Sequence, residues 1–184
     1  MAIEKYTTDS FVIESYDQGE HDKAFKLFTR EFGLIIAIAK GIRKLESKLR
    51  AHIRPRQLSR VTLVRGKEVW RVVGGEEILM ESTLHDTITS LINRFIKGQG
   101  PSRRLYDQMY ALLEASASYD EETTRLLIHY VMLVELGYAD AMIIGAKDIT
   151  EYKSYTTHDL YTHVLLNKER VKRHTLQVLK ESQL

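Results

Sequence analysis

Lys and Arg side chains are concentrated in one segment of this sequence. Residues 40–71 contain eleven Lys and Arg against only Glu46 and Glu68, although the formal net charge of the whole 184-residue chain is only +2. Such cations neutralise phosphate charge, and a glycine such as Gly41 exposes backbone N–H groups that donate to phosphate oxygens. A dense basic patch also raises the rate at which polyanions associate. The segment therefore predicts a binding site for nucleic acid or another polyanion.

The spacing of these cations brings several of them to one side. Pairs four residues apart, such as Lys44 and Lys48, share the face of a helix. Alternate residues, such as Arg54 and Arg56, share the face of a strand. The alternative is a solvated basic face without a ligand, which is common for short charge runs. We expect phosphate contacts from Lys40, Arg43, Lys44, Lys48, Arg50, Arg54, Arg56 and Arg60.

Two aromatic side chains are candidates for stacking on bases. Trp70 is the only tryptophan and falls on an expected strand, whereas Tyr6 lies in a polar stretch. A ring on an open barrel face contributes about 1–3 kcal/mol per stacked base. The alternative is that such rings fill the core, as we expect for Phe25 and Phe28. Tyr6 and Trp70 thus join the predicted nucleic-acid-binding residues.

The residue types that most enzymes and metal sites require are missing or poorly spaced. The chain has no cysteine, which excludes disulfides, thiolate zinc sites and cysteine nucleophiles. It has no HExxH, GxGxxG or GxSxG pattern and no phosphate-binding P-loop. His158 and His163 are five residues apart, which does not place them on one helical face. We therefore expect no catalysis, no metal and no cofactor.

The elements that position the basic segment read as β structure over residues 1–80. Apolar runs at 11–13, 24–29, 34–39, 58–64 and 69–73 are separated by glycine-containing turns, with hairpin loops expected at 17–20 and 65–68. Short strands of this kind form a small barrel or sandwich.

The pattern changes near residue 81, where we place the boundary to a helical domain of residues 81–184. Thr83 and Asp86 fit a capping box, and Ser102 and Asp120 cap two further helices. We also expect a short helical turn near 147–152 and a last helix over 157–181.

The helical half offers candidates for protein binding. Its apolar positions are suited to packing, but they also suit a groove for a peptide with an acidic end, to which the pair Arg103 and Arg104 is a candidate contact.

Composition bounds the class of protein. The apolar fraction of 43% and the charged fraction of 28% are those of an ordinary folded protein. No apolar run is long enough to span a membrane, and the N-terminus lacks the pattern of a secretory signal. We expect a cytoplasmic protein that does not bind membranes.

Several short motifs follow one another in a distinctive order. They are Thr8-Asp9-Ser10-Phe11-Val12-Ile13, Glu20-His21-Asp22-Lys23, Leu27-Phe28-Thr29-Arg30-Glu31-Phe32-Gly33, Ala39-Lys40-Gly41-Ile42-Arg43, Ser47-Lys48-Leu49-Arg50 through Pro55, Leu63-Val64-Arg65-Gly66, Trp70-Arg71 and Leu133-Val134-Glu135-Leu136-Gly137-Tyr138. Over residues 6–138 their order and spacing resemble RecO, a family of bacterial recombination-mediator and DNA-repair proteins.

This resemblance implies an α+β protein with an N-terminal oligonucleotide-binding (OB) fold and an all-helical C-terminal domain. It implies binding of single- and double-stranded DNA, annealing of complementary strands, and help in loading a recombinase onto coated single strands. The implied partners are a RecR-like protein and the acidic C-terminal tail of the single-stranded-DNA-binding protein. The four-cysteine zinc site of many family members has no counterpart in residues 139–157.

Two other classes of function fit the same residues. One is an interaction adaptor whose helical half docks protein tails. The other is an RNA-binding OB protein.

Overall fold

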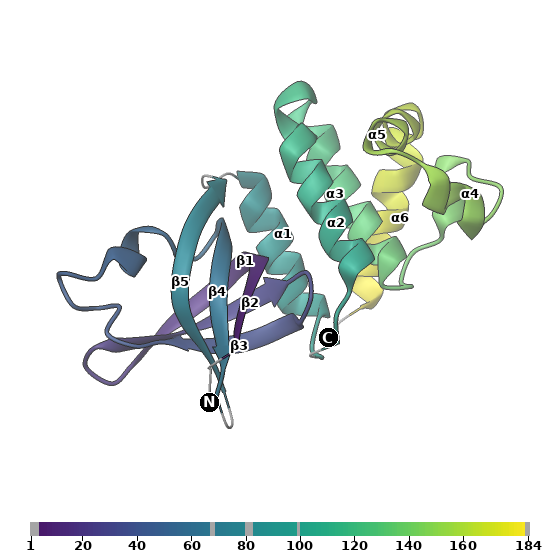
Figure 1. Cartoon of the computed structure of the whole chain (residues 1–184). Coiled ribbons are helices and arrows are strands. Elements are labelled where there is room, and N and C mark those ends of the chain that lie inside the picture. The colour runs from purple at the N-terminus through teal and green to yellow at the C-terminus, as the bar shows by residue number, and fades with distance from the viewer. Residues whose placement is uncertain (1–3, 67–68, 80–82, 99, 183–184) are drawn as a thin grey trace. The chain divides into compact units, whose positions relative to one another are not determined.

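The computed structural model describes residues 4–66, 69–79, 83–98 and 100–182. Its strands come first along the chain (Figure 1): β1 Lys5–Gln18, β2 Asp22–Thr29, β3 Gly33–Ala39, β4 Gln57–Arg65 and β5 Trp70–Leu79. The helices follow: α1 Thr83–Phe95, α2 Arg103–Ala115, α3 Glu121–Glu135, α4 Ile149–Ser154, α5 Thr157–Leu166 and α6 Lys168–Glu181. This order confirms the predicted α+β class. The predicted hairpin loop at 65–68 includes Lys67 and Glu68, which lie outside the described residues.

The strands close into a barrel in the order β1-β2-β3-β5-β4. β1 is long enough to pair with β4 along its first half and with β2 along its second. An irregularity between Val12 and Glu14 falls where β1 changes partner, and such bulges bend a strand. All pairs are antiparallel except β3 with β5, which pair in parallel at two positions and close the barrel. A five-stranded barrel of this kind is OB-like.

Alternation along the strands fills the barrel. Its core consists of inward side chains from all five strands, together with two isoleucines from the connection between β3 and β4. These buried residues are Val12, Phe25, Leu27, Ile35, Ala37, Ala39, Ile42, Ile53, Val61, Leu63 and Val72.

A second layer covers the outer face of β1. The apolar stripe of α1 is buried, as its spacing predicts, and the Phe11 ring of β1 lies 5.4 Å from the His85 ring and 5.2 Å from the Tyr106 ring. The change from strands to helices falls between Leu79 and Thr83, close to residue 81. The chain's two compact units, however, divide after Tyr106. The first helix groups with the barrel because β1 is apolar on both faces.

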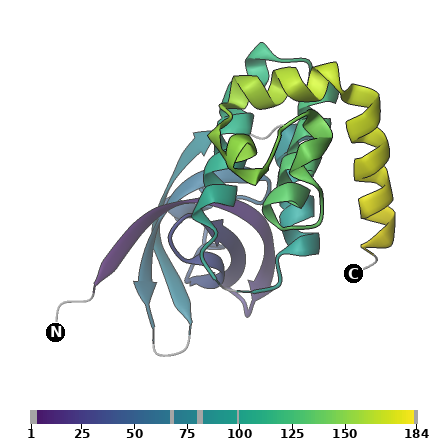
Figure 2. The same ribbon diagram turned by 90° about the vertical axis from the view of Figure 1, so that its right-hand side faces the viewer.

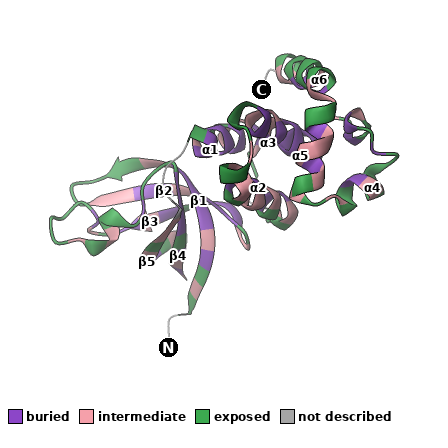
Figure 3. Cartoon of the chain, turned by 90° about the horizontal axis from the view of Figure 1, so that it is seen from above, coloured by how far each residue is buried: buried purple, intermediate pink, exposed green. Residues whose placement is uncertain are grey.

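The helical unit, residues 107–184, is built around α3. The side chains of α3 are largely buried, whereas those of α6 are largely exposed (Figure 3). Both α5 and α6 pack against α3. The predicted cap is confirmed, because the Asp120 carboxylate accepts a hydrogen bond from the Thr123 N–H at 2.8 Å.

The single helix predicted over 157–181 is wrong. The chain turns sharply between α5 and α6, the two helices at the yellow end of the colour scale in Figure 2. Asn167 leaves the helical conformation at φ −114° and ψ 23°. Its side-chain amide donates to the carbonyls of His163 and Ile144. Asn competes for backbone groups in this way, which weakens a helix interior.

Candidate nucleic-acid interface

The predicted phosphate contacts lie mostly in the connection between β3 and β4, residues 40–56. Apart from a single 3-10 turn, Lys48–Ala51, this connection has no regular structure. Neither a helix nor a strand therefore aligns Lys44 with Lys48 or Arg54 with Arg56, and the predicted spacing argument is wrong for these pairs. The path of the loop decides where its cations lie.

Two buried isoleucines anchor this loop to the barrel. Ile42 and Ile53 are 1% and 2% exposed and belong to the barrel core. A Cβ atom at Gly75 of β5 would lie 2.6 Å from the Ile53 side chain, so that glycine makes room for this anchor. Leu49 packs against the same core. The loop is thus held at several points, although it is rich in charge.

The start of the loop is also tied to the turn between β1 and β2. The Gly41 N–H donates to the Asp22 carboxylate at 2.7 Å, and the Arg43 N–H donates to the His21 carbonyl at 3.0 Å. Gly41 has φ +66°, a conformation that favours glycine. Figure 1 shows the loop and this turn at the same end of the barrel. The backbone here is fixed before any ligand binds.

Two of the predicted arginines are neutralised within the barrel unit. The Arg43 guanidinium lies 3.3 Å from an Asp17 carboxylate oxygen and donates to the Gly19 carbonyl at 3.0 Å. Arg56 lies 3.0 Å from the Asp86 carboxylate of α1. Arg56 also has φ +67°, the one positive φ at a non-glycine position among the described residues. Both side chains hold the loop in place, which competes with phosphate binding.

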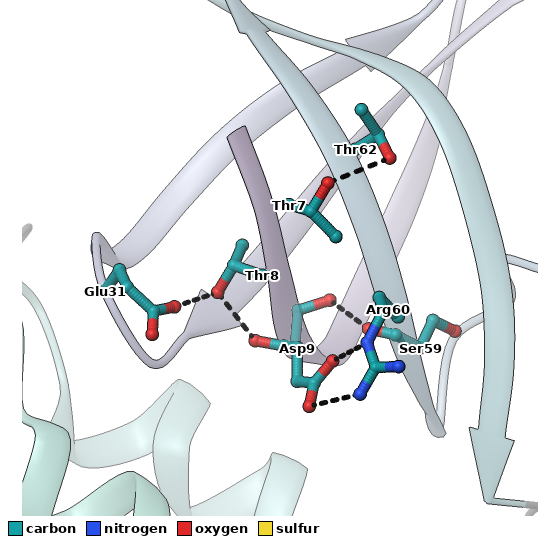
Figure 4. A network of polar contacts seen from close by, with 8 residues as sticks. Thr7, Thr8, Asp9, Glu31, Ser59, Arg60 and Thr62 are labelled. Atoms are coloured by element: carbon teal, nitrogen blue, oxygen red, sulfur yellow. Dashed lines mark hydrogen bonds and ion pairs between the residues drawn. The ribbon is translucent and has the colours of Figure 1, made fainter. Parts of the chain in front are cut away.

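Arg60 is similarly engaged on the outside of the sheet (Figure 4). Its Nε and Nη2 donate to the two oxygens of Asp9 at 2.7 and 3.2 Å, which is a bidentate pair between β4 and β1. Hydroxyl groups extend this network on both sides, since Thr7 contacts Thr62 at 3.5 Å and Ser10 donates to a carbonyl of β4. This network fixes the register of β1 on β4.

The remaining predicted cations are exposed, although the Arg54 guanidinium donates to the Ala51 carbonyl at 3.3 Å. Within the described part of the chain, none of them lies within ion-pair distance of a carboxylate. They are Lys40, Lys44, Lys48, Arg50 and Arg54. Charges without a carboxylate partner are available to an external anion.

The two predicted stacking residues lie in one aromatic cluster. The Tyr6 ring centroid is 5.6 Å from that of Trp70, and Phe32 lies 5.5 Å from Tyr6 and 4.8 Å from Trp70. The Arg65 guanidinium lies over the Trp70 ring at 5.5 Å. All three rings pack against the barrel core and are only partly exposed. Base stacking by Tyr6 and Trp70 stays a prediction, and these rings also have a packing role.

Sequence reasoning missed Phe32. This residue lies in the turn between β2 and β3, outside the apolar runs from which strands are read. A large aromatic side chain next to Gly33 could have indicated this role, because turns of this kind usually contain polar residues.

Arg103 and Arg104 lie in the first turn of α2, where Arg103 is exposed and Arg104 partly so. Their role in partner binding stays a prediction. In the residues that the structure describes, no group of three or more His, Asp or Glu side chains could hold a metal ion. No helix in those same ranges has both the length and the apolar character needed to cross a membrane.

The helical unit has a groove between α3 and α6 with a volume of about 200 Å³. Leu126, Leu176 and Leu179 supply its apolar lining. Arg125 and Lys172 also border it, and so does His129, whose pKa is lowered by burial. The His129 imidazole therefore stays neutral at neutral pH. The Thr175 hydroxyl, which lines the groove, is buried and has no hydrogen-bond partner among the described residues.

A closed five-stranded barrel is the architecture of an OB-fold protein. The anchored loop of this barrel is rich in cations, as in a site that binds polyanions. Comparison with known proteins agrees with this assignment of the fold. Residues 1–78 match the family described as recombination protein O, N terminal. Residues 1–78 are thus similar to the N-terminal part of the RecO family, in agreement with the resemblance of the motifs.

Relatives named DNA repair protein RecO include the following three. That of Caldanaerobacter subterraneus subsp. tengcongensis is 28% identical over 162 residues, covering 80% of this chain and 66% of the relative. That of Heliobacterium modesticaldum is 37% identical over 83 residues, covering 45% and 30%. That of Pelotomaculum thermopropionicum is 27% identical over 146 residues, covering 74% and 57%. The matched part of this chain thus spans at most 66% of the length of these relatives.

Proposed function

We propose that this chain is a non-enzymatic DNA-binding protein of recombinational DNA repair, acting in the cytoplasm at the nucleoid. The observation that carries the proposal is the set of exposed cations on a loop anchored by Ile42 and Ile53. Because the loop is already anchored, less conformational entropy is lost when it binds phosphates. The names of the relatives, DNA repair protein RecO, support the repair role.

The proposed task is annealing of complementary strands. Two strands repel each other through their phosphates, and cations bound to both reduce that repulsion. Backbone contacts carry no sequence information, so binding should be independent of sequence and include both single- and double-stranded DNA. A second proposed task is to help load a recombinase. The recombinase would be loaded onto single strands that are coated by the single-stranded-DNA-binding protein.

Salt-dependent binding of labelled DNA, with annealing measured in the same samples, tests this proposal. If five loop cations each contact a phosphate, log K against log salt has a slope of about −4.5 on duplex and about −3.5 on single strands. Replacing Lys48 and Arg50 with alanine should flatten the slope by about 1.8 on duplex and about 1.4 on single strands.

The matched control replaces Lys147 and Lys153, two exposed cations of the helical unit, with alanine. It removes the same charge and should leave the slope unchanged. A slope near zero in the unmodified chain would refute DNA binding by these cations. Competition between matched DNA and RNA oligonucleotides separates DNA binding from an RNA-binding role.

The groove between α3 and α6 favours a second function, docking of a protein tail. Its leucines suit an apolar or aromatic side chain. Arg125 and Lys172 pair with Glu121 and Glu122 in the free chain, so carboxylates of a tail would bind them in competition with these acids. The acidic C-terminal tail of the single-stranded-DNA-binding protein has this chemistry. A RecR-like protein is the other proposed partner. Arg103 and Arg104 are candidate contacts for the acidic end of a bound peptide.

A peptide ending in acidic and aromatic residues tests this second function on the full chain. We expect micromolar or tighter binding by calorimetry, and loss of binding in Leu176→Asp. The control Leu165→Asp changes an equally exposed leucine that does not line the groove. Equal binding by both variants would exclude the groove.

A further inference from the structure

Aliphatic side chains are exposed on the outer face of β3 and β5. Ile36 of β3 is 49% exposed and Val73 of β5 is 51% exposed. Val69, directly before β5, is 44% exposed, and Ile38 is partly exposed. Single exposed apolar residues are ordinary, but a contiguous set on adjacent strands marks a binding surface.

These side chains lie on or next to neighbouring strands of the barrel. Burial alternates along β3 from Ile35 to Ala39, so Ile36 and Ile38 face outward. Arg71 and Val73 face outward on β5, on either side of the buried Val72. The parallel pairing places Ile38 beside Arg71. We call Ile36, Ile38, Val69 and Val73 the aliphatic strip.

Cations accompany the aliphatic strip. Arg71 is exposed within it, and Lys40 follows directly on β3 as the first residue of the basic loop. In the ranges that the structure describes, neither side chain has a carboxylate within ion-pair distance. The strip is therefore continuous with the proposed phosphate contacts, and its own charges favour a polyanion.

We infer that the aliphatic strip contacts the bases of single-stranded nucleic acid while Arg71 and the loop cations hold its phosphates. A single strand presents apolar base faces and phosphates together, whereas a duplex hides the base faces in its stack. The inference rests on the proposed DNA binding and adds a strand preference: the loop binds both forms, and the strip favours single strands.

The test is the double variant Ile36→Thr and Val73→Thr. Threonine keeps the β-branched shape that suits a strand, so the barrel should fold, which its melting temperature checks. Affinity for a single-stranded oligonucleotide should fall by about ten-fold, because apolar area is no longer buried. Affinity for duplex should not change. The salt slope on single strands should also not change, since no phosphate contact is lost.

The matched control is Leu166→Thr, which changes an exposed leucine of the helical unit and should have no effect. Equal single-strand affinity in the double variant and the unmodified chain overturns the inference but leaves loop binding standing. If the unmodified chain sediments as a dimer that the double variant converts to monomers with its single-strand affinity intact, the strip is a subunit contact and the inference is also overturned. If the unmodified chain binds neither form of DNA, the proposed function itself fails. Should the double variant melt early, Ile36→Thr alone gives the same comparison.

Discussion

The basic loop of the barrel and the basic helix α6 use the same kinds of side chain in different ways. In the helical unit, Lys168 lies 2.8 Å from the Glu122 carboxylate and Lys172 lies 4.0 Å from it. These pairs join α6 to the first turn of α3, where acidic residues also favour the helix dipole. In loop 40–56, Lys48 and Arg50 are exposed and face no such acid in the described residues. A count of charges therefore says less about binding than the position of the acids.

The largest expected effect comes from removing the anchor of the loop. Ile53→Ala leaves every cation in place but empties a buried site, so the free energy of unfolding should fall by about 2–5 kcal/mol. DNA affinity should fall as well, because the loop is no longer held. Urea denaturation and DNA titration measure both effects. Leu45→Ala, at a position 87% exposed in the same loop, is the control. Equal results for the two variants would show that anchoring is irrelevant.

Acid should weaken the barrel unit through His85. Burial lowers the pKa of His85 to about 4 from an ordinary value of 6.5. In the unfolded chain, His85 is therefore protonated below about pH 6.5, whereas in the folded chain it is protonated only below about pH 4. The contribution of neutral His85 to the free energy of unfolding is therefore fully present above about pH 6.5. It is lost as the pH falls toward about 4, by about 3 kcal/mol in total.

Urea unfolding of the unmodified chain and of His85→Gln at pH 7 and pH 5 measures this term. The glutamine variant should lose less stability between the two pH values. His129→Gln is the counterpart in the helical unit, since burial also lowers the pKa of His129. The same pH dependence with and without His85 would contradict the prediction.

Removing the paired cations of α6 should leave DNA binding unchanged. Lys168→Ala with Lys172→Ala removes the same charge as the Lys48 and Arg50 double variant, but these cations already contact Glu122. We expect an unaltered salt slope and a small loss of stability. A slope flattened as much as by the loop variant would remove the distinction between the two regions.

The smallest expected effect is a gain. Asp17→Asn releases Arg43 and Lys23 from a shared carboxylate. The salt slope on single strands should steepen by about 0.7 for each cation that then reaches a phosphate. Glu122→Gln is the matched change in the helical unit and should have no such effect. If Asp17→Asn leaves the salt slope unchanged, Arg43 holds the loop in place and does not contact a phosphate.

Local features of the fold followed from the sequence. The cap at Asp120 is an interaction between residues three apart, and the strand runs are set by alternation within a few residues. The break at Asn167 was not predicted, because its amide reaches Ile144, which is 23 residues away. The pairing of Arg60 on β4 was also not predicted, since its partner Asp9 is 51 residues away in the sequence.

By itself the sequence determined where the positive charge is concentrated and that short alternating strands precede helices. Both depend on residue type and on neighbours along the chain. Only the tertiary structure decided which cations remain exposed and that Phe32 joins Tyr6 and Trp70. It also decided that Ile36 and Val73 lie on one outer face. These outcomes depend on distances between segments that meet only when the barrel closes.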